Sequence, residues 1–109
     1  MSQPVDKLRA NLSVQLKAAM TKRDQVATSA LRAVMGTLDN ASAVPLSSVA
    51  ETDRSEIPRR ELSQSDIDRI LDAEIEVRLH ALAEFQRLGN AAEVSAIERS
   101  IEIIKGLKA

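Results

Sequence analysis

Apolar residues recur every three or four positions along most of the chain, which is the spacing of one face of an α-helix. A first helix is predicted over residues 4–22, with Pro4 suited to a first helical position. Its apolar side contains Val5, Leu8, Leu12, Leu16, Ala19 and Met20. A second helix is predicted from Asp24, its N-cap, to about residue 43. The short segment between them predicts an antiparallel helical hairpin.

The apolar face of the second helix contains Val26, Ala30, Leu31, Val34, Met35 and Leu38. Gly36 falls off this face and costs helix stability, about 1 kcal/mol relative to alanine. Two interpretations are open for Gly36: it admits the close approach of another backbone, or an exposed glycine is simply tolerated.

A second hairpin is predicted after residue 62. Ser63 begins a long helix as its N-cap, with Asp66 three residues on, close to a capping box. Gly89 suits the residue just after that helix, and Asn90 suits the N-cap of a last helix ending near Gly106. The stripe of the long helix consists of Ile67, Ile70, Leu71, Ile75, Leu82, Phe85 and Leu88, and that of the last helix of Val94, Ile97, Ile101 and Ile104.

The helical pattern stops over residues 44–62, where Pro45, Pro58 and several serines occur. This segment is interpreted as a mobile linker with one helical turn near residues 49–54. The sequence therefore predicts an all-α fold. We expect four main helices, arranged as two helical hairpins in a single domain over residues 1–109.

Composition agrees with packed helices and restricts the chemistry. Only 1% of the residues are aromatic, so the core must be aliphatic, and there are no cysteines. No apolar run approaches the roughly 20 residues of a membrane span, and residues 1–6 lack the pattern of a secretory signal. A cytoplasmic protein without a membrane partner is expected. The net charge of −1 argues against a strongly basic nucleic-acid binder. Residues 1–40, however, contain six basic and three acidic side chains.

Two charged residues interrupt the stripe of the long helix. On a helical wheel with Ile67 at 0°, Glu74 falls at about 340° and Arg78 at about 20°. Their spacing and order favour an ion pair within the helix. One interpretation is a structural ion pair inside the fold, and the other is that Arg78 faces an anionic ligand. Arg32, off the main stripe of its helix, is a possible third member.

Residues typical of catalysis or cofactor binding are few. His80 is the only histidine, has no partner with metal-ligand spacing, and is expected at the surface. The three glycines are too far apart for a phosphate-binding loop. No catalytic residue, metal site or cofactor is predicted, and the chain is not expected to act as an enzyme alone.

Two sets of motifs resemble the YqeY-like family. The run from Leu16 to Asp24, followed by residues 29–32 (Ser-Ala-Leu-Arg), is similar to the family's first hairpin. Residues 61–63 (Glu-Leu-Ser), the Glu74-Ile-x-x-Arg78 pattern and Glu84-Phe-x-x-x-Gly89 are similar to its third helix and glycine stop. The resemblance covers about residues 5–107. It departs from the family at Ala30, in the composition of the linker, and in the expected absence of the family's second, C-terminal helical domain.

The resemblance implies a relation to the tail of the B subunit of the glutamine-dependent Asp/Glu-tRNA amidotransferase, which is associated with holding tRNA. The family-level activity is that of a carbon–nitrogen ligase with glutamine as amido-N donor, whose active site lies elsewhere in the enzyme. The expectation is a non-catalytic helical module with tRNA or a tRNA-dependent amidotransferase complex as partner. Its candidate contacts for RNA or a protein are Lys22, Arg23, Arg32 and Arg78.

An alternative function is protein interaction or homo-oligomer formation without an RNA role. Val14, Val77 and Leu79 lie beside or outside the main stripes and are available for such a face.

Overall fold

The computed structural model describes residues 4–43 and 61–108, and its regular structure consists entirely of helices. In chain order these are α1 (Pro4–Thr21), α2 (Gln25–Ser42), α4 (Gln64–Leu88) and α5 (Ala91–Lys105). The predicted all-α class is confirmed. The linker predicted over 44–62, with its helical turn near 49–54, lies outside the described residues except for Glu61 and Leu62. No described helix combines the length and apolar character needed to cross a membrane.

The helix ends form where local side chains satisfy the backbone. Asp24 accepts a hydrogen bond from the amide of Ala27 at 3.2 Å and caps α2. Ser63 and Asp66 form the reciprocal capping box of α4, at 3.1 and 2.9 Å. Gly89 ends α4 with a φ of 70°, a left-handed conformation that glycine adopts without strain. Asn90 then caps α5.

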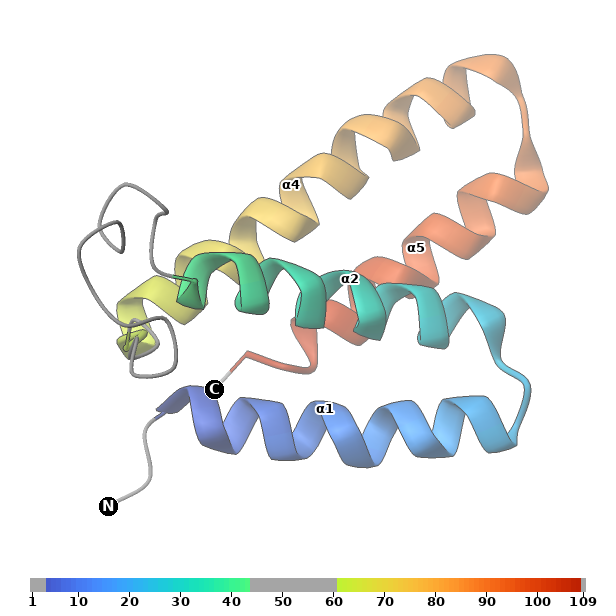
Figure 1. The fold of residues 1–109 in the computed structure, drawn as a ribbon. Coiled ribbons are helices and arrows are strands. Elements are labelled where there is room, and N and C mark those ends of the chain that lie inside the picture. The colour runs from blue at the N-terminus through green and yellow to red at the C-terminus, as the bar shows by residue number, and fades with distance from the viewer. Residues whose placement is uncertain (1–3, 44–60, 109) are drawn as a thin grey trace.

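Two antiparallel hairpins, α1–α2 and α4–α5, cross each other, and α2 packs against each of the other three helices (Figure 1). The core between the hairpins is aliphatic, as the composition predicted. The largest fully buried side chains are Leu12, Leu31, Val34, Leu38, Leu62, Leu71 and Ile104. Both hairpins therefore contribute to one core, and neither covers its own apolar face.

Two residues assigned to the apolar stripes are exposed in the structure. Met20 is 50% exposed, while Ala19 beside it is buried. Residues four apart differ by about 40° around a helix. After several such steps Met20 therefore lies on a different side of α1 from Leu8 and Leu12, which face the core. Leu88 is 60% exposed because it lies on the flank of α4, where α4 extends beyond α1 and α2. The prediction that Met20 and Leu88 belong to the apolar faces of their helices was therefore wrong.

Gly36 is exposed, and a Cβ atom added to it would meet no atom of residues 4–43 or 61–108 within 4 Å. The interpretation that Gly36 admits a close backbone approach is therefore wrong, and the tolerated glycine is what the structure contains.

The end of the α4–α5 hairpin extends away from α1 and α2 (Figure 1). No residue between Ile75 and Ile101 is buried. Phe85, Leu82 and Ile97 are only half-buried there because two helices alone cover one another incompletely. This end of the molecule depends on local helix stability and capping more than on the core.

We expect Leu71→Ala to lower the free energy of unfolding by about 2–5 kcal/mol, since Leu71 is fully buried and alanine would leave a cavity. The matched control is Leu88→Ala on the same helix, which should change it by less than about 0.5 kcal/mol because Leu88 is exposed. Urea denaturation measures both. Equal losses for the two variants would contradict the placement of the core.

Candidate functional site

The Glu74–Arg78 pair forms on α4, with Nη1 of Arg78 at 2.8 Å from Oε2 of Glu74. The side chains are only 19% and 17% exposed, respectively. The same Nη1 also donates to the backbone carbonyl of Glu74 at 2.9 Å. The pair therefore lies mostly inside the fold, where each charge needs further partners to offset its desolvation.

Those partners come from the two neighbouring helices. Thr37 on α2 donates to Oε1 of Glu74 at 2.5 Å, with the carbonyl of Ala33 a second acceptor at 3.0 Å. Ser100 on α5 accepts from Nε of Arg78 at 2.8 Å. Neither Thr37 nor Ser100 was predicted as a partner from the sequence. A hydroxyl side chain that meets an ion pair on another helix does not change the spacing of apolar residues along its own helix. The four residues link α2, α4 and α5 at their crossing.

Arg32 is not part of this network. Its guanidinium instead contacts the sulfur of Met20 at 3.8 Å, beside the end of α1. The backbone amide of Arg23 donates to the carbonyl of Met20 at 3.1 Å. Met20 thus places Arg32 close to the turn that contains Lys22 and Arg23. Arg32 therefore lies against the last turn of α1, next to the turn that contains Lys22 and Arg23, whereas Arg78 is bonded to Glu74 and Ser100.

This basic turn (Lys22, Arg23 and Arg32) is exposed to solvent. None of the three forms an ion pair with another described residue. Arg23 has a φ of 57°, and it is the one non-glycine position with a positive φ in the described chain. The turn therefore presents three exposed cations that form no salt bridge with a described residue, although the charge of Lys22 helps to lower the pKa of Asp24.

Asp24, next to this turn, has a second role besides capping α2. Arg99 on α5 donates from Nη1 to Oδ1 of Asp24 at 2.8 Å and from Nη2 to Oδ2. The hydrogen bonds from Arg99, and then that from the Ala27 amide, lower the pKa of Asp24 to about 2. The hydrogen bonds between Arg99 and Asp24 also raise the pKa of Arg99. Asp24 therefore joins the first hairpin to the second, a role that its position in the sequence did not reveal.

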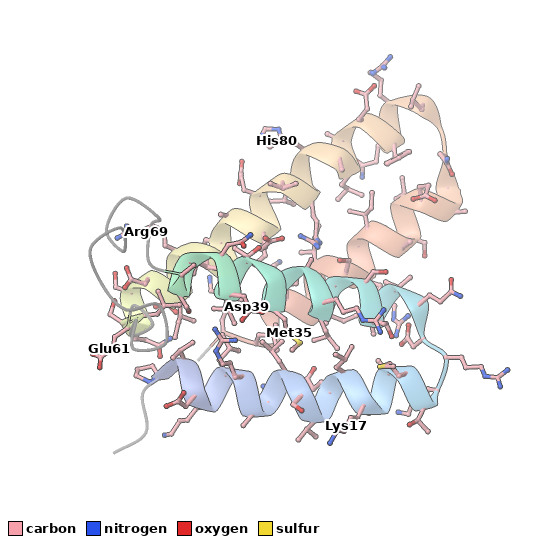
Figure 2. The ribbon with its side chains drawn as sticks, viewed as in Figure 1. Lys17, Met35, Asp39, Glu61, Arg69 and His80 are labelled. Atoms are coloured by element: carbon pink, nitrogen blue, oxygen red, sulfur yellow. The ribbon has the colours of Figure 1, made fainter. Side chains whose placement is uncertain are left out.

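The other surface residues singled out in the sequence are a histidine and three exposed apolar side chains. His80 lies on the outer side of α4 (Figure 2), with Nε2 at 3.2 Å from Glu76. Within residues 4–43 and 61–108, no three acidic or histidine side chains are grouped as a metal site. Val14, Val77 and Leu79 are exposed, as expected of residues outside the stripes.

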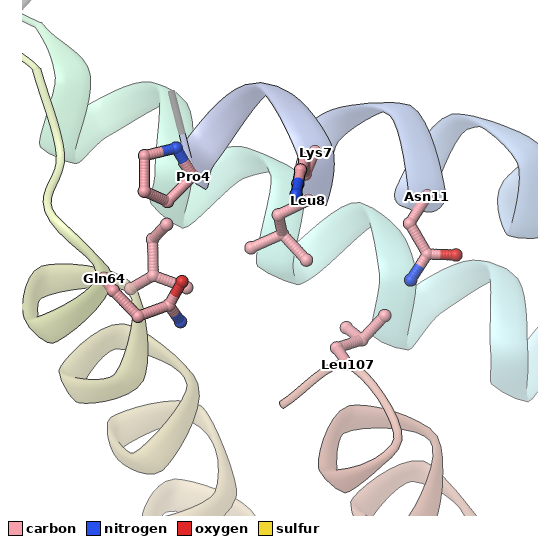
Figure 3. A pocket seen from close by; sticks show the side chains of 7 residues that line it. Pro4, Lys7, Leu8, Asn11, Gln64 and Leu107 are labelled. Carbon is pink, nitrogen blue, oxygen red and sulfur yellow. The ribbon is translucent and has the colours of Figure 1, made fainter. Parts of the chain in front are cut away.

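A cavity of about 290 Å³ lies where the start of α1 meets the start of α4 and the chain after α5 (Figure 3). Leu8, Ile67 and Leu107 form its apolar part, and Lys7 and Gln64 are among its polar lining. None of the predicted site residues lines it.

Comparison with known proteins gave no match to any family model, curated protein or solved structure. Within the chain, several of the motif residues that resemble the YqeY-like family have structural roles. Asp24 caps α2, Glu74 and Arg78 link three helices, and Gly89 ends α4.

We expect Glu74→Ala and Arg78→Ala each to lower the free energy of unfolding by about 1–3 kcal/mol, because each leaves a buried charge without its partner. The double variant should cost less than the sum of the two. The exposed pair Glu84 and Arg87, also on α4, is the matched control and should show much weaker coupling, because solvent screens both charges. A near-neutral effect of both single changes would contradict a buried network.

Because the pKa of Asp24 is about 2, against 3.8 ordinarily, its ionised form stabilises the fold above about pH 4. That contribution should disappear progressively as the pH falls to about 2. Asp24→Asn keeps an N-cap but loses the charge, so its unfolding free energy should fall less over this range than that of the wild type. Arg99→Gln should flatten the profile in the same way. Urea denaturation at several pH values measures the slopes, and a wild-type slope in both variants would refute this role.

Proposed function

We propose that the chain is a non-catalytic helical module that binds the phosphate backbone of RNA, with tRNA as the expected class. The observation that carries this proposal is the basic turn, where Lys22, Arg23 and Arg32 are exposed and form no ion pair with any described residue. The motif resemblance to the tRNA-associated tail of the amidotransferase supports the same class of partner.

Phosphate groups suit this surface for electrostatic reasons. Guanidinium groups hydrogen-bond phosphate oxygens, and lysine adds a positive charge on a flexible stem. Positive charge in residues 1–40 exceeds negative charge by three, so the turn lies in the basic part of the chain. Contacts of this kind position a nucleic acid without reading its bases.

Arg78 is left out of the proposed RNA surface. Three of its N–H groups already donate to Glu74 and Ser100 inside the fold. No catalytic role is assigned to any residue, and any carbon–nitrogen ligase activity of the family would reside in other parts of such an enzyme.

Fluorescence anisotropy of labelled tRNA, titrated with the full chain at several salt concentrations, tests this function. Binding should weaken steeply as salt rises, because each phosphate contact releases bound cations. A triple variant with Lys22→Ala, Arg23→Ala and Arg32→Ala should bind more weakly. Its salt slope should be shallower by about two to three units, from the loss of three phosphate contacts.

The control variant combines Lys7→Ala and Arg69→Ala, which also remove exposed positive charge. Arg69 lies near the start of α4, at the other end of the molecule from the basic turn (Figure 2). This control should retain the wild-type salt slope. The absence of wild-type binding at low salt would rule out the proposed function, and equal slopes for the two variants would rule out this surface.

A further inference from the structure

An open groove of about 330 Å³ lies beside the buried network, between the start of α2, the middle of α4 and the first half of α5. Its volume is at the lower end of the range of about 300–1,000 Å³ typical of small-molecule sites. Apolar surface comes from Val26, Ala96 and Ile97, and polar groups come from Ser29, Arg78 and Glu93. None of the three residues of the basic turn lines it.

Arg78 has unused donors at this groove. A guanidinium carries five N–H groups. Nε donates to Ser100 and the two hydrogens of Nη1 go to Glu74, which leaves the two on Nη2. No buried side-chain nitrogen or oxygen of the described residues lacks a hydrogen-bond partner. Nη2 therefore reaches solvent, and the groove is the open space that Arg78 lines.

Glu93 gives the groove a charge of the opposite sign. Its backbone amide is used by the cap residue Asn90. Its carboxylate is exposed and forms no ion pair with another described residue. The groove therefore offers a pair of guanidinium donors and a separate carboxylate acceptor, with apolar side chains between the helices.

We propose that this groove binds a zwitterionic α-amino acid with a small aliphatic side chain. The ligand's carboxylate accepts from Nη2 of Arg78, its ammonium group pairs with Glu93, and its side chain contacts Val26, Ala96 and Ile97. A phosphate would be repelled by Glu74 and Glu93, and a simple cation by Arg78. A ligand that carries both charges on adjacent groups meets neither repulsion.

The test is an NMR titration of the full, uniformly ¹⁵N-labelled chain with L-valine. Shift changes should be confined to backbone amides around the groove, including those of Ser29, Ala96 and Ile97. N-acetylvaline lacks the ammonium charge and valinamide lacks the carboxylate, so each should cause smaller shifts at the same concentration. Glu93→Gln should weaken valine binding by about twofold to fivefold, as expected for an exposed ion pair, and should leave binding of N-acetylvaline unchanged.

Because Arg78→Ala disturbs the buried network, Ser29→Leu serves as the blocking variant. Ser29 is an exposed position of α2 that lines the groove, and leucine there should fill it and abolish the shifts. The same substitution at exposed Ser13 on α1 is the matched control and should bind like the wild type. The proposal is overturned if valine up to about 10 mM, the range of weak millimolar binding, causes no localised shifts. It is equally overturned if Ser29→Leu binds like Ser13→Leu, or if both derivatives bind like valine. None of these outcomes bears on RNA binding at the basic turn.

Discussion

The burial of a carboxylate and a guanidinium at the crossing of three helices is the constraint on which the arrangement of this protein depends. Glu74 and Arg78 are both more than four-fifths buried, and leaving either without partners would be costly in free energy. Oε1 of Glu74 and Nε of Arg78 find their partners where Thr37 of α2 and Ser100 of α5 approach α4. Two helices that cross through apolar contacts alone can shift along one another by one helical turn. At this crossing the donors and acceptors of the three helices match in one alignment only. We infer that the network defines the register between the two hairpins, while the aliphatic core supplies most of the stability.

Sequence reasoning located the features whose causes are local. Asp24, Ser63, Gly89 and Asn90 were predicted as helix boundaries because caps act within three or four residues. Glu74 and Arg78 were predicted to interact because their spacing fixes their proximity on any helix. Thr37, Ser100 and Arg99 were missed because their roles arise only when helices distant in sequence cross. Arg32 was misjudged as a possible third member for the same reason, and Leu88 because periodicity does not show where a covering helix ends.

The two proposed sites differ in how the fold treats charge. At the buried network nearly every charge and donor is matched within the chain, and only the outer nitrogen of Arg78 remains for a small ligand. At the basic turn the three cations form no salt bridge with a described carboxylate, since the hydrogen bonds of Asp24 go to Arg99 and Ala27. The described chain thus separates a directional, nearly neutral groove from a diffuse positive surface. The first suits recognition by geometry, and the second suits a polymer of phosphates.

The left-handed backbone of Arg23 has a consequence for how stability is distributed. A side chain with a Cβ atom in that conformation costs about 1–2 kcal/mol, which glycine would largely avoid. The α1–α2 turn would thus close more favourably with glycine, and no described contact of the Arg23 side chain explains the choice of arginine. Strained residues of this kind cluster at active sites, ligand-binding sites and switch regions. The free energy of unfolding is therefore lower than the same turn would allow with glycine. That loss of stability is located at Arg23, one of the exposed cations of the basic turn.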